Sequence, residues 1–170
     1  MTTINYYVID SSSLIELNRR YPIDVFPTLW KNVEILIEKG FLISHKEVRK
    51  EILAFLGRDE SLKKWVEKQK KFFKELDEKQ MEIVKEILKK YPSLAKSDNE
   101  TATADPFVIA LAVEMGSNKQ QTLFNTVKGR IIVTEEKLRG NKVKIPFVCK
   151  DYNIECINII EMCRVEGWKF

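Results

Sequence analysis

Acidic residues stand at the ends of the apolar runs of this chain. Asp10 directly follows INYYVI, and Asp105 begins DPFVIALA. Glu135 and Glu136 directly follow RIIVT, and Glu51 lies on the charged helical stretch EVRKEI. Carboxylates held close together raise one another's pKa, so a cluster of them is costly unless a cation shares it. Because Mg²⁺ or Mn²⁺ takes oxygen ligands, polarises phosphoryl oxygens and activates water, the acids predict a metal site that hydrolyses phosphodiesters.

Each acid also has a purely structural interpretation. Asp10 would cap the helix that follows it, and Asp105, which precedes a proline, would cap the next apolar helix. Glu51 would be an ordinary surface residue of a charged helix. A solvated turn would account for both Glu135 and Glu136. For Asp10 we favour the site, because a buried strand that stops at an acid is typical of the functional edge of a parallel sheet.

Short β-branched and aromatic runs alternate with helical patterns along the chain. The predicted strands are residues 4–10, 41–44, 130–134 and 154–159. The predicted helices are residues 14–20, 28–40, 45–57, 104–116, 145–153 and 160–168. This alternation predicts an α/β fold, a three-layer α/β/α sandwich with a central, mostly parallel sheet covered on both faces. We expect the acids to lie beyond the carboxyl ends of its strands.

Residues 58–91 differ from the rest, because apolar residues recur at helical spacing on a Lys and Glu background and no strand pattern appears. We predict one long helix or a helical hairpin broken near Asp77, forming a helical insertion or lid within the domain. Its apolar stripe is expected to be core, with part of it open to a second copy or a partner helix. The stripe comprises Leu62, Trp65, Phe72 and Phe73.

The chain has 170 residues, of which 44% are hydrophobic and 32% charged, and its formal net charge is +4. This length and composition predict one globular domain over residues 1–170 with a core of its own. No apolar run reaches the ~18–20 residues of a membrane span, and no N-terminal stretch resembles a signal peptide. We therefore expect a cytoplasmic protein with no membrane partner.

Cysteine and histidine chemistry is not expected to operate here. Cys149, Cys156 and Cys163 are odd in number and lie on a segment that changes character between them, so buried thiols are expected instead of a disulfide or a metal site. His45 is the only histidine and lies in SHKEVRKEI, where a solvent-facing or capping role is expected. Acid–base chemistry would then depend on the carboxylates.

Four short motifs resemble, in order, those of the PIN-domain nuclease family. YYVIDSSSLIEL resembles the opening motif, a strand that ends in Asp before a hydroxyl residue and an apolar helix. EVRKEI is similar to the second motif, with Val48 three positions before Glu51. ADPFVIALA is similar to the third motif, and IIVTEE takes the place of the fourth. The resemblance covers nearly the whole chain apart from residues 58–91.

The resemblance implies a PIN-like fold and a Mg²⁺- or Mn²⁺-dependent endoribonuclease, such as the toxin of a type II toxin–antitoxin pair (VapC-type). It also implies RNA as the substrate, an antitoxin protein as a partner and a homodimer. The catalytic residues would be Asp10, Glu51 and Asp105, with Glu135 or Glu136 as the fourth acid. The metal ligands would be Asp10, Asp105 and Glu136. The fourth acid is commonly Asp in the family and is Glu here.

A basic cluster flanks the predicted site, and contacts from Lys and Arg dominate binding to a nucleic-acid backbone. The cluster comprises Lys128, Arg130, Lys137, Arg139, Lys142 and Lys144. We predict that four of these contact RNA phosphates: Lys128, Arg130, Lys137 and Arg139. The lysines of residues 63–71 fit the solvated face of an amphipathic helix better.

Two other functions fit parts of the sequence. A non-catalytic PIN-like module that binds RNA or protein would tolerate Glu as the fourth acid. An aspartate-based phosphatase or phospho-acceptor domain would use Asp10 as its nucleophile, but such phosphatases usually carry a second Asp two positions later, where this chain has Ser12. Ser12 matches a position of the nuclease family where a hydroxyl or an amide often steadies the metal shell, and helix capping explains this serine equally well.

Overall fold

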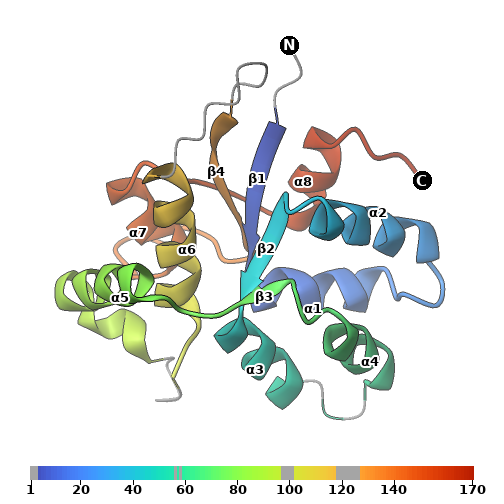
Figure 1. The fold of residues 1–170 in the computed structure, drawn as a ribbon, viewed down its shortest axis with the longest axis horizontal. Helices are drawn as coiled ribbons and strands as arrows, with labels where there is room; N and C mark the ends of the chain where they lie inside the picture. The colour runs from blue at the N-terminus through green and yellow to red at the C-terminus, as the bar shows by residue number, and fades with distance from the viewer. Residues whose placement is uncertain (1–3, 56, 58, 97–101, 118–126) are drawn as a thin grey trace.

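A computed structural model describes residues 4–55, 57, 59–96, 102–117 and 127–170. Within them, five strands form one sheet in the order β3-β2-β1-β4-β5, and every neighbouring pair is parallel (Figure 1). The strands are β1 (Ile4–Ile9), β2 (Leu42–His45), β3 (Phe73–Lys74), β4 (Val127–Val133) and β5 (Glu155–Ile157). The predicted central parallel sheet is therefore confirmed.

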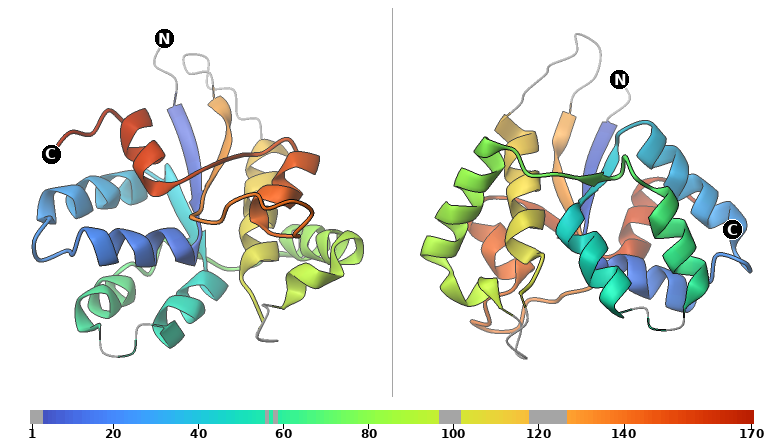
Figure 2. Two further views of the ribbon diagram at one scale, coloured as in Figure 1. Left: turned by 180° about the vertical axis from the view of Figure 1, so that it is seen from behind. Right: turned by 60° about the horizontal axis from the view of Figure 1, so that its bottom comes forward.

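Helices cover both faces of this sheet. They are α1 (Ser11–Arg20), α2 (Pro27–Glu38), α3 (Lys46–Phe55), α4 (Glu60–Lys68), α5 (Glu78–Lys90), the 3₁₀ helix η1 (Pro92–Ala95), α6 (Asp105–Ser117), α7 (Ile145–Asp151) and α8 (Ile159–Val165). Figures 1 and 2 show α5, α6 and α7 on one side of the sheet and α1, α2, α4 and α8 on the other, which confirms the predicted α/β/α sandwich. In the described ranges, no helix is long and apolar enough to cross a lipid bilayer.

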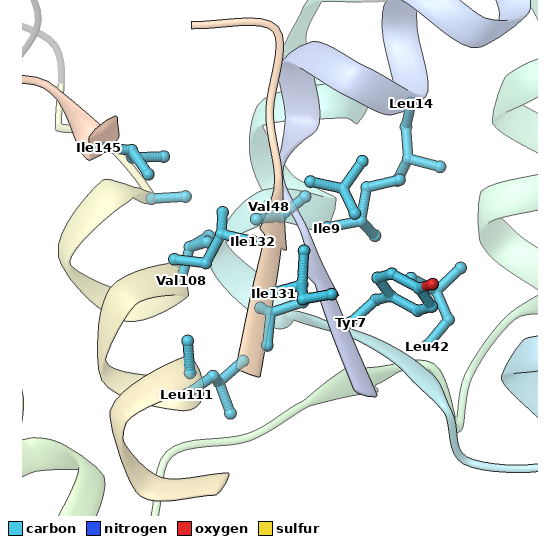
Figure 3. Packing of buried hydrophobic residues seen from close by; sticks show 14 of the residues in the cluster. Tyr7, Ile9, Leu14, Leu42, Val48, Val108, Leu111, Ile131, Ile132 and Ile145 are labelled. Atoms are coloured by element: carbon cyan, nitrogen blue, oxygen red, sulfur yellow. The ribbon is translucent and has the colours of Figure 1, made fainter. Parts of the chain in front are cut away.

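The core forms around the central strands, which are buried on both faces. Residues 7–9 of β1 and Ile132 of β4 are completely buried. Aromatic and β-branched side chains on both faces suit a central parallel strand. Figure 3 shows Val108 of α6 on one side of these strands and Leu14 of α1 on the other. The sheet thus holds the two helical layers together.

Residues 58–91 depart from the prediction of a wholly helical segment. The helices α4 and α5 are present, but β3 lies between them and pairs with β2 at the edge of the sheet. The backbone N–H of Ser44 donates to the carbonyl of Phe72 (3.0 Å), and Ser44 aligns with Phe73. A two-residue strand is too short to show a periodicity, so the sequence pattern cannot reveal it. The predicted break near Asp77 is confirmed, because Asp77 is the N-cap of α5.

The apolar stripe of this segment belongs to the core. Its four side chains are 7% exposed or less: Leu62, Trp65, Phe72 and Phe73. The ring of Trp65 stands edge-on to the ring of Trp30 in α2, with 4.9 Å between the centroids. The prediction that these residues form core is confirmed, and none of the four is left open for a partner.

His45 is completely buried, so the expectation of a solvent-facing side chain is wrong. It is the last residue of β2, and the strand carries it inward. Its Nδ1 accepts a hydrogen bond from the backbone N–H of Glu47 (3.1 Å), which confirms the capping role at the start of α3. The imidazole stacks on the ring of Phe107 (5.0 Å). Burial lowers the pKa of His45 to about 4, so the ring is neutral at pH 7.

The three cysteines lie on three different elements near the carboxyl terminus. Cys149 of α7 is buried, whereas Cys156 of β5 and Cys163 of α8 are partly exposed, and all three are free thiols. The prediction of buried thiols is correct for Cys149 and correct only in part for the other two.

We predict that Leu14→Ala lowers the free energy of unfolding by about 3 kcal/mol, because it leaves a cavity beside β1 that the surroundings fill only partly. Leu14 is completely buried, whereas Phe55 is 68% exposed. Phe55→Ala is therefore the control, with an expected change within about 0.5 kcal/mol. Urea denaturation followed by circular dichroism measures both variants. Equal effects of the two substitutions would contradict this description of the core.

Candidate functional site

Asp10 lies at the carboxyl end of β1 and is the N-cap of α1. Its backbone N–H donates to the carbonyl of Val133 (2.9 Å), so the pairing with β4 continues up to this residue. Asp10 Oδ1 accepts from the backbone N–H of Ser11 (2.7 Å), and Oδ2 accepts from the hydroxyls of Ser12 (2.8 Å) and Thr134 (3.2 Å). The residue is only 2% exposed. The helix-cap interpretation is thus correct, and the same contacts hold the carboxylate in one orientation.

Glu51 connects three elements of the fold. Its Oε2 accepts from the hydroxyl of Ser11 (2.5 Å), and its Oε1 accepts from the backbone N–H of Ala104 (2.5 Å), one residue before α6. Burial raises the pKa of Glu51, these two hydrogen bonds oppose the increase, and the charge of Asp10 adds to it. The interpretation of Glu51 as an ordinary surface residue is therefore wrong. It ties α3 to the starts of α1 and α6.

Asp105 lies in the first turn of α6 and is 7% exposed. Burial, followed by the charges of Asp10, Glu136 and Glu51, raises the pKa of Asp105 to about 8. The charge of Lys144 acts in the opposite direction. Burial has the larger effect, and the three acidic neighbours add a negative potential at the same carboxyl group. Such a potential favours the binding of a cation.

The two adjacent acids that follow β4 point to different parts of the fold. Glu136 Oε2 accepts from the backbone N–H of Ile145 (3.0 Å) at the start of α7. Glu135 Oε1 instead accepts from the backbone N–H of Ile159 (3.0 Å) at the start of α8 and from the hydroxyl of Ser13 (3.3 Å). Glu135 therefore accepts a hydrogen bond at the start of α8. Glu136 is the acid of this pair whose charge acts on Asp105.

Four of the five predicted acids are electrostatically connected, because the charge of Asp10 raises the pKa of the other three, Glu51, Asp105 and Glu136. Burial raises the pKa of Glu136, and the charge of Asp10 adds to this effect. The four come from the end of β1, from α3, from the start of α6 and from the loop after β4. These segments meet at the carboxyl edge of the sheet, at the lower side of Figure 1 where α1 and α3 begin. The structure thus brings together residues that are far apart in the sequence.

The predicted phosphate contacts are placed unevenly around this edge. Lys137 and Arg139 are exposed on the loop that follows β4. Lys128 and Arg130 belong to the first half of β4, at the end of the strand away from the acids. The side chains of these last two lie outside the described part of the structure. Contact of the four residues with RNA stays a prediction.

Two hydroxyl groups and one lysine take part in the site and were not predicted as site residues. Ser11 and Thr134 each donate to a site carboxylate. Lys144 Nζ lies 3.7 Å from Glu136 Oε1. A hydroxyl directly beside an acid at the end of a predicted strand was a usable signal for both hydroxyls. No local pattern distinguishes this lysine from the other basic residues of its loop.

The site offers oxygen ligands, the kind that Mg²⁺ and Mn²⁺ prefer. Among the described residues, no three carboxylate, imidazole or thiol groups lie in an arrangement that would hold a metal ion. Mg²⁺ needs fewer protein ligands, because it usually binds one or two carboxylates and keeps several waters. The donor set therefore fits a hydrated divalent ion, whose charge would relieve the repulsion that adds to the effect of burial on the pKa of Asp105.

We predict that Asp105→Asn stabilises the metal-free protein. Between pH 3.8 and about 8, the folded protein keeps a proton on Asp105 that the unfolded chain releases, so the stability falls as the pH rises. Asparagine does not titrate, so the variant should exceed the wild type by roughly 2 kcal/mol near neutral pH. The difference should shrink as the pH approaches 4.

Urea titrations in chelator, at several pH values between about 4 and 8, measure this difference. Asp24→Asn, the same chemical change at an exposed position, is the control and should follow the wild type. A difference between Asp105→Asn and the wild type that does not depend on pH would contradict the electrostatic explanation.

Comparison with known proteins identifies a family. A search of curated proteins and of solved structures finds no match. A family-level comparison matches residues 7–170, a range that includes all four acids of the site. This chain therefore belongs to the family described as a domain of unknown function, DUF4411.

Proposed function

We propose that this protein is a divalent-metal-dependent endoribonuclease that hydrolyses RNA phosphodiester bonds. The observation that carries the proposal is the convergence of four acids at the carboxyl edge of the sheet, where the charge of Asp10 raises the pKa of Glu51, Asp105 and Glu136. Buried or half-buried acids whose pKa is raised, as for Glu51, Asp105 and Glu136, are typical of functional sites, and a divalent cation relieves the repulsion between such acids. RNA as the substrate rests on the resemblance to PIN-domain nucleases.

Asp10, Asp105 and Glu136 would hold Mg²⁺ or Mn²⁺, directly or through water. The bound ion supplies a Lewis acid for a phosphoryl oxygen and a water of lowered pKa. The protein contributes the fixed positions of the ligands. The hydroxyls of Ser12 and Thr134 hold the carboxylate of Asp10 in place without removing its charge.

Glu51 has a different role in this proposal. Both of its carboxylate oxygens accept hydrogen bonds from the protein itself, from Ser11 and from Ala104. These contacts fix the starts of α1 and α6, and those two helices carry Asp10 and Asp105. We therefore assign Glu51 as a positioning residue that sets the distance between the two aspartates.

The biological setting is a further part of the proposal. The resemblance to VapC-type proteins supports a toxin of a toxin–antitoxin pair that acts in the cytoplasm. Its partners would be RNA, an antitoxin protein and a second copy of the chain. Phosphate contacts from Lys137 and Arg139 would hold the RNA beside the acids, because both side chains are exposed on the loop that follows β4.

The site favours this function over the alternatives. Phosphatases with an aspartyl nucleophile usually carry a second Asp two positions later, whereas this chain has Ser12, whose hydroxyl donates to Asp10 Oδ2 (2.8 Å). A non-catalytic binding module would have no use for the acid cluster, because repulsion between buried carboxylates destabilises a fold.

We predict that Asp10→Asn lowers kcat/KM for metal-dependent RNA cleavage by about 100-fold, because a neutral amide attracts the cation less strongly. Cleavage of a labelled single-stranded RNA by purified protein in Mn²⁺ measures this loss. Asp24→Asn, which makes the same chemical change at an exposed position, should cleave RNA at the wild-type rate.

Calorimetry with Mn²⁺ alone gives a second readout for the same variants. Asp10→Asn should bind Mn²⁺ at least about 10-fold more weakly than the wild type, whereas Asp24→Asn should not differ from it. A wild-type protein that takes up no Mn²⁺ and cleaves no RNA would overturn the proposal. Undiminished cleavage by Asp10→Asn would show that the reaction takes place elsewhere.

A further inference from the structure

Lys144 differs from the exposed basic residues of the loop after β4. Lys137 and Arg139 are exposed, whereas the side chain of Lys144 is 29% exposed, and its Nζ lies 3.7 Å from Glu136 Oε1. Burial is the main influence that raises the pKa of Asp105, and the charge of Lys144 opposes it. The ammonium group therefore lies at the acid cluster and not on the outer surface of the loop.

The backbone holds Lys144 in this position. Lys144 is the N-cap of α7, and its carbonyl accepts from the backbone N–H of Val148 (3.1 Å). The next residue, Ile145, donates its backbone N–H to Glu136 Oε2 (3.0 Å). The same carboxylate thus holds the start of the helix with one oxygen and faces the ammonium with the other. A side chain supported in this way presents its charge at a defined place.

The contact between Lys144 and Glu136 leaves the ammonium able to bind another group. Its 3.7 Å separation is long beside the 2.7 Å of the Lys50–Glu47 pair on α3. An ammonium group has three N–H donors, and one distant carboxylate oxygen uses at most one of them. Donors therefore remain for an incoming anion.

We infer that Lys144 is a catalytic residue that donates a hydrogen bond to a non-bridging oxygen of the scissile phosphate. This inference rests on the proposed nuclease function. A phosphodiester that approaches four carboxylates meets a repulsive field, so a cation fixed by the protein is needed in addition to the metal ion. A lysine suits this task because its ammonium is a compact charge that binds phosphate. Glu136 is then both a metal ligand and the positioning residue for Lys144.

The test compares Lys144→Met with Lys144→Arg and with the control Lys150→Met, which removes the same charge at an exposed position of α7. On single-stranded RNA in saturating Mn²⁺, Lys144→Met should lower kcat/KM by about 10- to 100-fold, the loss expected for one charged hydrogen bond. The slope of log(kcat/KM) against log[salt] should become shallower by about 0.7, as for one lost phosphate contact. Lys144→Arg should restore most of both, and Lys150→Met should match the wild type.

Mn²⁺ calorimetry without RNA separates this inference from the proposed function. Lys144→Met should bind Mn²⁺ at least as tightly as the wild type, because a repelling charge is gone and the fold is retained. Loss of Mn²⁺ binding, or a wild-type kcat/KM and salt slope, would overturn the inference and leave the nuclease intact. Absence of RNA cleavage by the wild-type protein would overturn the proposed function, and this inference with it.

Discussion

Parallel pairing of β1 with β4 is the constraint on which the site depends. The register aligns Ile9 with Val133, so the next residues, Asp10 and Thr134, are neighbours joined by a 3.2 Å hydrogen bond. A slip of one residue would turn every side chain of β1 to the opposite face and separate this pair. The shared strand direction also places the end of β2 at the same edge, and α3 then carries Glu51 to the site.

The hydrogen-bond donors that hold the acids of the site are uncharged groups, except for the ammonium group of Lys144. The uncharged donors are the backbone N–H groups of Ser11, Ala104 and Ile145 and the hydroxyls of Ser11, Ser12 and Thr134. Such donors orient a carboxylate and leave its charge in place, so the negative potential survives in the folded protein. The repulsion costs stability, and sites that bind or react commonly carry such a cost. This repulsion adds to the effect of burial, which is the main cause of the raised pKa of Asp105.

The segment of residues 58–91 supports the site from a distance. The helix α6 is apolar around most of its circumference, and a helix of this kind must be covered on all sides. The sheet covers one side, and α5 packs against α6 as well. The ring of Tyr91, just after α5, stands edge-on to Phe147 of α7 (6.3 Å). Residues far from the acids therefore fix α6, which carries Asp105, and α7, which Lys144 precedes as the N-cap.

Local patterns were enough to predict three of the five strands closely, the helices around them and the positions of Asp10 and Asp105. A helix or strand that buries one face has apolar residues at a regular spacing, and the first residues of a helix are of particular types. Both effects act over a few neighbours in the chain. They therefore leave a signal that can be read before folding. The strand β5 was also predicted, although it is shorter than the pattern suggested.

Contacts between distant segments determine the features that the sequence did not predict. Glu135 and Glu136 are adjacent and chemically alike, and the starts of α8 and α7 determine which of them turns toward the acids. Phe73 is a strand residue because its segment pairs with β2 at the edge of the sheet. His45 is buried because Phe107 of α6 stacks on its ring. Each outcome depends on a contact between segments far apart in sequence. Such a contact leaves no periodicity in either segment, so it exists only once the chain has folded.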